Sequence, residues 1–377
     1  MSTLEACVRI TVYVLALVIS SGEMTIDAWA LSQTCGPLKE VASLRMTVLP
    51  DGSRVSVPIT IDGKPVNLLV DTGAGMSGLT KPAAMTLGIR LRDSEAVRLV
   101  DEDGIAVHRY YVADSFQLGS LTAKNVPFMQ HADIDDVRVN GTIGPDLMVR
   151  YDVELDFSEK RLTYFSQDHC PGHVVHWQND AVAQVPIRIT ARAKDYPLPD
   201  VNPAVTSLSP DFVGFVMSFG SPILGTDIRA QVMLDGRSFT ANIDTGLDIS
   251  MINSKAAQEY FDVPLDSHQS DVSETHQDQP PQAIPGTEAV TVTGWRQRHR
   301  FHTLTFGGVK VVDPLFVMKP SPSRVHRVDD PDSPDITIGM NVLRRLHLYF
   351  AFGEGMLYVS AAANQVETQT SGSGERK

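Results

Sequence analysis

The chain repeats part of its own sequence, and this repeat limits the possible folds more than any other feature. Residues 62–84 align without gaps on residues 235–257 at an offset of 173, and residues 142–165 align on residues 337–360 at an offset of 195. Self-similarity over such lengths predicts two copies of one structural unit. Because the offsets differ by 22, the second copy must hold about that many additional residues between its matched blocks.

Each copy has the hydrophobic pattern of a small, mostly β unit. In the first copy, Val55–Ile61 alternates apolar and polar residues, Asp62-Gly63 is a hairpin turn signal, and Val66–Val70 continues as a largely apolar strand. A short helical stretch at 146–150 then precedes two further strand patterns, and the second copy repeats this order over 341–359. We therefore expect a mainly β protein.

Composition indicates where the copies begin and end. A chain of 377 residues is long enough for two domains, and we expect a first lobe at 41–170 and a second lobe at 181–362. Two stretches rich in polar residues and proline, 191–224 and 266–286, are expected to be insertions, and the second of them accounts for the additional length. A flexible tail is expected at 363–377.

Residues 1–30 have the pattern of a secretory signal peptide. An uncharged apolar run at 10–20 precedes Ala28-Trp29-Ala30, a small-x-small pattern of the kind that signal peptidases cleave. The run is shorter than the roughly 20 residues of a membrane-spanning helix. The alternative is a buried N-terminal helix, which Glu5 and the polar stretch 21–27 favour. We expect an exported protein, periplasmic or secreted.

The charge of the chain excludes several classes of partner. Lys and Arg number 32 against 45 Asp and Glu, so the formal net charge is -13. Such an acidic chain repels nucleic acid and anionic lipid headgroups. We expect no nucleic-acid partner and no transmembrane span, and the basic run at 296–302 fits a solvated strand face.

The cysteines predict a disulfide. Cys7 would leave with the signal peptide, so the mature chain keeps the pair Cys35 and Cys170, as expected in an oxidising compartment. The alternative is a zinc site formed by four residues of suitable spacing: His169, Cys170, His173 and His176. One cysteine without a second cysteine cluster is a weak zinc pattern. We therefore expect no metal and no cofactor.

Two carboxylates carry the chemistry that the repeat predicts. Asp71 and Asp244 occupy equivalent positions, each at the end of an apolar strand, where a carboxylate is costly to bury unless it is paired or hydrogen-bonded. In the first copy, Gly73 permits a close backbone approach, and the Thr72 hydroxyl can brace a facing loop. A pseudo-two-fold axis would bring the two aspartates together, and they would then share one proton.

These motifs resemble those of the retropepsin-like aspartic protease family. Val70–Ala74 is similar to the catalytic loop of the retroviral members, and Thr142-Ile143-Gly144 and Thr337-Ile338-Gly339 lie where the family has a strand crossing behind that loop. The resemblance covers about 54–165 and 226–360. Two such loops, each followed by the same later motif, are a specific pattern, whereas one Asp-Thr-Gly tripeptide would be weak.

The resemblance implies the fold and the site. It implies two retropepsin-like β-barrel lobes related by pseudo-two-fold symmetry, with the active site between them. Asp71 and Asp244 would be catalytic, and Thr72-Gly73 and Thr245-Gly246 would support the loops. Retroviral proteases carry one such unit in each chain and dimerise, so this chain looks like a fused pair that is active as a monomer.

The sequence departs from the family pattern beside the catalytic loops. Leu247 stands where the family prefers Ser, Thr or Ala, and its bulk could narrow the site. Asp248 matches an acidic position that holds substrate backbone in retroviral enzymes, while its counterpart Gly75 cannot do so. We name Ala74, Leu247 and Asp248 as candidate substrate-binding residues, and we expect substrate contacts to differ between the lobes.

The resemblance also implies a flap, a hairpin that closes over substrate and excludes water. The candidate in the first lobe is Val97–His108, with its turn at Glu102–Gly104, so Gly104 joins the candidate substrate-binding residues. An ordinary surface hairpin is the alternative. In the second lobe the equivalent region holds the polar insertion, and the sequence does not locate a tip.

The sequence thus predicts an exported aspartic endopeptidase in which Asp71 and Asp244 activate a water molecule. A peptide-binding protein without turnover is the first alternative, because Leu247 could keep the loops from meeting. The second alternative is that the lobes act separately, each pairing with a second chain. The expected partner is a peptide or protein substrate.

Overall fold

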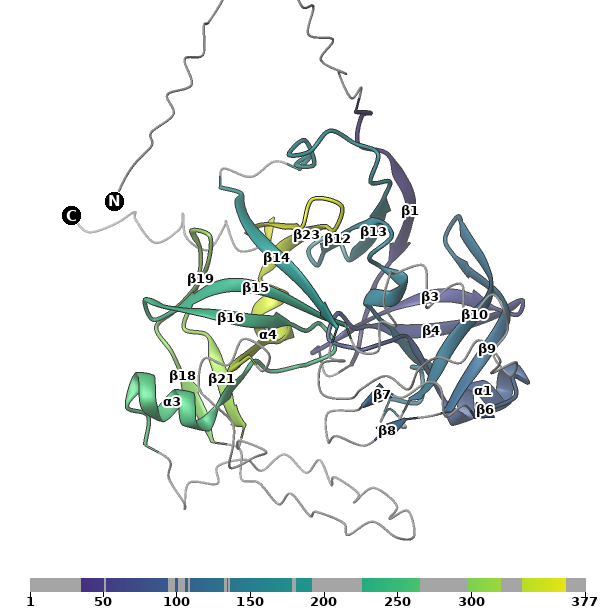
Figure 1. The fold of residues 1–377 in the computed structure, drawn as a ribbon, viewed down its shortest axis with the longest axis horizontal. Coiled ribbons are helices and arrows are strands. Elements are labelled where there is room, and N and C mark those ends of the chain that lie inside the picture. The colour runs from purple at the N-terminus through teal and green to yellow at the C-terminus, as the bar shows by residue number, and fades with distance from the viewer. Residues whose placement is uncertain are drawn as a thin grey trace, which may run out of the picture. The chain divides into compact units, whose positions relative to one another are not determined.

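Strands make up most of the fold, and the helices between them are short (Figure 1). The computed structural model describes residues 35–50, 52–93, 99–100, 106–107, 109–131, 134, 136–177, 181–191, 226–264, 297–319 and 334–363. Its helical segments are α1 (Lys81–Leu87), η1 (Pro145–Leu147), α3 (Ser254–Phe261) and α4 (Met340–Leu343). This confirms the mainly β class.

Several predicted segments lie outside the described residues. They are the signal peptide at 1–30, the insertion at 191–224 beyond its first residue, the insertion at 266–286 and the tail beyond residue 363. The predicted lobe boundaries stay predictions, and Gly36–Lys377 forms one compact unit.

The first copy builds a sheet with the strand order β2-β3-β4-β11-β5-β10-β9-β6. Its strands are β2 (Thr47–Val48), β3 (Val55–Ile61), β4 (Lys64–Val70), β5 (Gly78–Thr80), β6 (Arg92–Asp93), β9 (Arg109–Leu118), β10 (Leu121–His131) and β11 (Gly141–Ile143). The predicted turn joins β3 to β4, and both Asp62 (φ 49°) and Gly63 (φ 75°) have the left-handed backbone that a tight hairpin requires.

The second copy repeats these pairings inside a larger sheet, part of which has the strand order β14-β15-β16-β22-β17-β21-β18; β19 pairs with β15, and β20 pairs with β19. The strands that correspond to the first copy include β15 (Thr226–Leu234), β16 (Arg237–Ile243), β17 (Met251–Asn253), β21 (Leu315–Lys319) and β22 (Ile336–Ile338). The others are β14 (Ala183–Ala191), β18 (Arg298–Arg300), β19 (Thr303–Phe306) and β20 (Val309–Val312). The turn before β16 again has a left-handed Asp-Gly pair, Asp235 and Gly236.

A helix follows the Asp-Thr-Gly loop in both copies and is capped in the same manner. Thr80 precedes α1, and its hydroxyl accepts a hydrogen bond from a backbone N–H of the first turn. Asn253 precedes α3, and its amide oxygen accepts a hydrogen bond from Lys255 N. Each helix ends in a left-handed residue, Gly88 or Asp262. Caps of this kind satisfy backbone groups that a short helix would otherwise leave unpaired.

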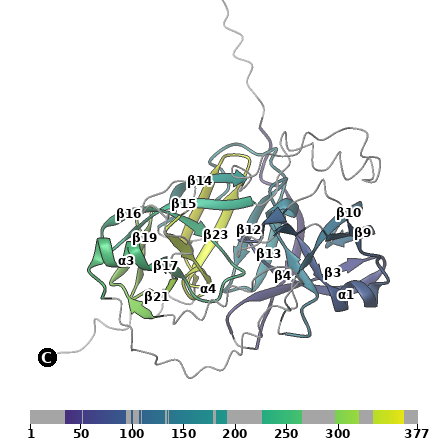
Figure 2. The same ribbon diagram turned by 60° about the horizontal axis from the view of Figure 1, so that its bottom comes forward.

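The C-terminal hairpins of the two copies form one continuous sheet. β12 (Asp152–Asp156) and β13 (Arg161–Phe165) come from the first copy, and β23 (Leu346–Ala351) and β24 (Met356–Ala361) from the second; β1 (Glu40–Arg45) adds to β13. β12 pairs with β23 in antiparallel register (Figures 1 and 2). We call the sheet β1-β13-β12-β23-β24-β14 the junction.

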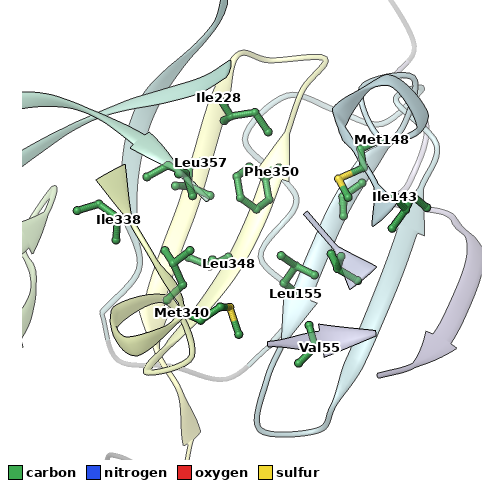
Figure 3. Close-up of a cluster of buried hydrophobic side chains, with 14 of the residues drawn as sticks. Val55, Ile143, Met148, Leu155, Ile228, Ile338, Met340, Leu348, Phe350 and Leu357 are labelled. Atoms are coloured by element: carbon green, nitrogen blue, oxygen red, sulfur yellow. The ribbon is translucent and has the colours of Figure 1, made fainter. Parts of the chain in front are cut away.

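One hydrophobic core continues across the junction. Leu155 of β12 lies opposite Leu348 of β23, and both are fully buried. Figure 3 shows these two residues with Phe350 and Leu357 of the second copy and Met148 of the first. The two copies therefore share apolar contacts in addition to backbone hydrogen bonds, and burial of this kind is the main favourable contribution to folding.

Charged residues are buried beside this core on the other face of the junction. Glu154 of β12 accepts hydrogen bonds from His347 Nε2 of β23 (2.9 Å) and from His176 Nε2 (3.2 Å). Burial alone would raise the pKa of Glu154, but the hydrogen bonds from the histidines outweigh it and lower that pKa to about 2. The bond with Glu154 in turn raises the pKa of His176. Trp177 stacks on His347 with a centroid distance of 4.3 Å.

Cys35 and Cys170 are both disulfide-bonded, so Cys170 is not a free thiolate for zinc. His169 Nε2 is hydrogen-bonded to Asp152 at 2.6 Å. In the described part of the chain, His, Cys, Asp and Glu side chains nowhere gather in threes that could hold a metal ion. Nor do the described helices include one with the length and apolar character needed to cross a membrane.

The buried Glu154 predicts a pH-dependent stability. A folded-state pKa of about 2, below the unfolded value of about 4.3, means that Glu154 stabilises the fold above about pH 4 and that this contribution is lost as the pH falls through 2. Glu154→Gln should lower the free energy of unfolding by roughly 3 kcal/mol at pH 5.5, and by much less near pH 2. Urea unfolding of the wild type and the variant at both pH values measures this difference.

The matched control is Glu159→Gln, because Glu159 is exposed in the adjacent hairpin turn. It should change the free energy of unfolding by no more than about 0.5 kcal/mol. Equal effects of the two substitutions, or an effect of Glu154→Gln that does not shrink at low pH, would contradict the role given to Glu154.

Candidate active site

The two Asp-Thr-Gly loops emerge from equivalent pairs of parallel strands. β11 runs parallel to β4 behind the first loop, and β22 runs parallel to β16 behind the second. The backbone N–H of Asp71 donates to Ile143 O, and that of Asp244 donates to Ile338 O, both at 3.0 Å. The predicted crossing strands therefore hold both loops in the same way.

The carboxylate of each aspartate packs against the glycine of the opposite loop. A Cβ atom placed on Gly73 would lie 2.2 Å from Cγ of Asp244, and one placed on Gly246 would lie 2.3 Å from Cγ of Asp71. No side chain fits at such distances, so both loops require glycine at this position. Asp71 and Asp244 thus face one another across the contact between the two loops.

Each carboxylate also accepts hydrogen bonds from its own loop. Gly73 N donates to Asp71 Oδ1 at 3.0 Å, and Gly246 N donates to Asp244 Oδ1 at 2.9 Å. Leu247 N adds a further bond to Asp244 Oδ1 at 3.1 Å. Hydrogen bonds to backbone N–H groups orient a carboxylate and favour its charged form.

Two threonines connect the loops through reciprocal hydrogen bonds. Thr72 Oγ1 donates to Ile243 O at 2.7 Å and accepts from Thr245 N at 3.0 Å. Thr245 Oγ1 donates to Val70 O at 2.8 Å and accepts from Thr72 N at 3.0 Å. Both threonines are buried. These four bonds cross from one copy to the other within a single chain.

A second layer of polar residues lies behind each loop. Ser77 N and Oγ both donate to Asp146 Oδ1 at 2.8 Å, and in the second copy Ser250 N and Oγ donate to Asn341 Oδ1 at the same distance. Sequence analysis did not identify these four residues as part of the site. The signal was present, because Ser77 and Ser250 are identical residues within the first repeated block.

The residues after each loop differ between the copies. Ala74 and Leu247 are half-buried, and Asp248 is exposed. The carbonyl groups of Leu247 and Asp248 accept hydrogen bonds from the start of α4, at 2.8 and 2.9 Å. Leu247 does not keep the loops apart, since the reciprocal threonine bonds are formed in both directions.

The arms of the predicted flap are present as a hairpin. β7 (Leu99–Val100) pairs with β8 (Ala106–Val107) in antiparallel register, and the pairing is symmetric about position 103, the middle of the predicted turn. Gly104 and the rest of that turn lie outside the described residues, as does the equivalent region of the second copy at 265–296.

Comparisons with known proteins support the resemblance to aspartic proteases. Residues 57–147 match a family model described as aspartyl protease, and this segment contains the first Asp-Thr-Gly loop and the crossing strand behind it. A search of curated proteins finds no match. The matched segment supports a protease-type function.

Similar solved structures include three chains of low sequence identity. A retropepsin-like aspartic protease from Rickettsia conorii is 19% identical, with a TM-score of 0.26, and the match covers 34% of this chain and 92% of that one. Basic 7S globulin from soybean (10% identity, TM-score 0.44) matches over 87% of this chain and 97% of its own. An aspartic proteinase from Irpex lacteus (13% identity, TM-score 0.44) matches over 85% of this chain and 97% of its own.

The reciprocal threonine bonds predict a large loss of stability when one hydroxyl is removed. Thr72→Val keeps the shape of the side chain but leaves the N–H of Thr245 and the carbonyl of Ile243 without this partner. Two buried groups left unpaired should lower the free energy of unfolding by about 3 kcal/mol. Thr72→Ser, which retains the hydroxyl, should cost about 1 kcal/mol or less. Denaturant unfolding measures both.

Thr142→Val is the matched control for this prediction. Thr142 is also a buried threonine behind the same loop, but its Oγ1 forms no hydrogen bond to the described residues. Replacing an unpaired buried hydroxyl by a methyl group should be neutral or stabilising. Equal losses for Thr72→Val and Thr142→Val would show that the cross-loop bonds do not hold the two copies together.

Proposed function

We propose that the chain is an aspartic endopeptidase in which Asp71 and Asp244 activate one water molecule for attack on a peptide bond. One observation carries the proposal: each carboxylate lies against the glycine of the opposite loop, so the two aspartates belong to one site. The match of residues 57–147 to the aspartyl protease family supports the same reaction class.

The arrangement accounts for general acid–base catalysis without a covalent intermediate. The ionised carboxylate takes a proton from water as the water oxygen attacks the peptide carbonyl carbon, and the protonated carboxyl gives its proton to the carbonyl oxygen. A tetrahedral diol results. A proton then moves to the amide nitrogen, the C–N bond breaks, and the dyad returns to its singly protonated state. Both aspartates are needed, because each step uses one acid and one base.

The substrate that fits this chemistry is a peptide or a protein. Ala74, Leu247 and Asp248 follow the two catalytic loops and would contact a bound peptide, and the β7–β8 hairpin would close over it. The half-buried Leu247 and the exposed Asp248 make the second copy the bulkier and more acidic side of the site. We therefore expect unlike substrate residues on the two sides of the cleaved bond.

Export is part of the proposal. The N-terminal signal pattern at 1–30 supports it, and the disulfide-bonded Cys35 and Cys170 fit an oxidising compartment. The mature enzyme would then act in a periplasm or outside the cell. We also propose that it acts as a monomer, with lobes at 41–170 and 181–362, because the threonine bonds between the loops are intrachain.

A peptide-binding protein without turnover is the remaining alternative. It was suggested by Leu247, whose bulk could have separated the loops. The loops meet through all four threonine hydrogen bonds and Leu247 N itself donates to Asp244, so nothing in the loop backbone favours this alternative. Turnover of a peptide decides between the two functions.

The proposal predicts that Asp71→Asn and Asp244→Asn each reduce kcat/KM by at least about a thousandfold, because neither single carboxylate can serve as both acid and base. Purified mature protein would be incubated with a peptide library, and cleavage of the best peptide would then be followed for each variant by mass spectrometry. Asp114→Asn is the matched control, because Asp114 is exposed on β9, and it should cleave like the wild type.

Unfolding curves of the variants separate loss of chemistry from loss of fold. Near-normal cleavage by one single variant would contradict the intrachain dyad and would favour separate sites formed with a second chain. Binding of peptides without cleavage by the wild type would support the non-catalytic alternative instead.

A further inference from the structure

We propose that Asp146 is a positioning residue that holds the Asp71 loop as a neutral carboxylic acid, so that its ionisation loosens the loop and limits activity at high pH. The inference rests on the proposed function for its catalytic consequence. Its structural part, a buried neutral carboxyl group behind the loop, can be tested without any substrate.

Hydrogen bonds connect Asp146 to the candidate catalytic loop. Its Oδ1 accepts from Ser77 N and Oγ, both at 2.8 Å, and Ser77 Oγ accepts in turn from Gly144 N at 2.9 Å. Gly144 follows Ile143, whose carbonyl accepts the backbone N–H of Asp71. Asp146 therefore acts on Asp71 through Ser77 and the end of β11, and it does not itself face the site.

The second copy performs the same task with a neutral side chain. Asn341 occupies the position of Asp146 in the repeat, and its Oδ1 accepts from both donors of Ser250 at 2.8 Å. Gly339 N likewise donates to Ser250 Oγ, at 3.0 Å. A protonated carboxyl group has the planar shape of an amide, with one carbonyl oxygen that accepts and, opposite it, one group that donates: O–H in the acid and NH2 in the amide. The repeat thus contains a natural neutral equivalent of Asp146.

The remaining atoms of the two side chains show why Asp146 needs a proton. Asn341 Nδ2 donates to Leu315 O at 2.7 Å, whereas the buried Oδ2 of Asp146 forms no hydrogen bond to the described residues. The registers of β5 with β10 and of β17 with β21 place Pro127 where the second copy has Leu315. A protonated Oδ2 would be a donor, like Asn341 Nδ2 in the second copy, whereas an ionised carboxylate has no donor.

Burial provides the driving force for keeping the proton. Only 6% of Asp146 is exposed, and burial raises its pKa to about 6, even though hydrogen bonds from Ser77 and from the backbone N–H groups of Asp146 and Leu147 lower it. A charge at this position would also lie near the Tyr164 hydroxyl of β13, which is fully buried and forms no hydrogen bond to the described residues. The phenol of Tyr151 packs edge-on against Tyr164.

The strand β15 also packs against η1, the short helix that contains Asp146. Its charged residues Asp227 and Arg229 form an ion pair with each other, with their side chains 3.2 Å apart. The pKa of Asp146 is higher in the folded state than the unfolded value of about 3.9, so the folded state binds more protons between about pH 4 and 6. Folding stability therefore falls as the pH rises through this window.

Exchanging the two equivalent residues provides the test. Wild type, Asp146→Asn and Asn341→Asp would be compared by the pH dependence of kcat/KM for one cleaved peptide and by thermal unfolding without substrate from pH 4 to 8. With a pKa near 6, only about 3% of Asp146 is protonated at pH 7.5. For each protein, kcat/KM at pH 7.5 would be divided by kcat/KM at pH 5. Relative to the wild type, Asp146→Asn should raise this ratio by about tenfold or more, and Asn341→Asp should lower it.

Two measurements need no substrate, so they test the neutral Asp146 even if the proposed function is wrong. They are the pH dependence of the melting temperature and the infrared spectrum. The wild-type melting temperature should fall between pH 4 and 7 more steeply than that of Asp146→Asn. Infrared spectra should show a protonated carboxyl band that titrates near pH 6 in the wild type and is missing in Asp146→Asn. If no peptide is cleaved but these signals are found, the proposed function fails and the neutral Asp146 stands. Identical pH profiles and spectra for wild type and Asp146→Asn would overturn the inference.

Discussion

The contact between each aspartate carboxylate and the glycine of the opposite loop is the constraint on which the rest of the structure depends. With Gly73 and Gly246 against the carboxylates, the two loops approach more closely than any side chain would permit. Such an approach places two acids side by side, and the cost is offset by backbone hydrogen bonds and by the threonine bonds between the copies. The crossing strands and the junction sheet keep both loops at this separation.

Local pattern was sufficient to predict much of the fold and of the site. The Asp-Gly turns, the strands beside them and the two Asp-Thr-Gly loops each depend on residues close together in the sequence, and the repeat showed that each occurs twice. The pairing of β12 with β23 was not predictable, because strand register between distant segments depends on tertiary packing. The buried Glu154 with its histidine partners was missed for the same reason, since the three residues come from different segments.

The second layer of polar residues behind the loops contains one pair of residues that the repeat makes visible and one pair that it does not. Ser77 and Ser250 are identical and could have been identified, but their acceptors are Asp146 in one copy and Asn341 in the other. An aspartate and an asparagine are not identical residues, so counting identities does not reveal this pair, although the two side chains have the same shape and differ in that only the aspartate can ionise. Differences of this kind make the two halves of a pseudo-symmetric site chemically unequal, and Leu247 adds a further difference on the side of the second copy.

The central claim is that one chain holds one site built from both aspartates. Its most direct test is the binding stoichiometry of a peptide analogue in which a hydroxyl-bearing tetrahedral carbon replaces the cleaved amide, because such a group resembles the reaction's intermediate. Isothermal titration calorimetry, with sedimentation to establish the size of the complex, should give one analogue bound per monomeric chain, with binding strongly weakened by Asp71→Asn and by Asp244→Asn alike. Two analogues per chain, one per pair of chains, or binding that survives the loss of either aspartate would contradict the account.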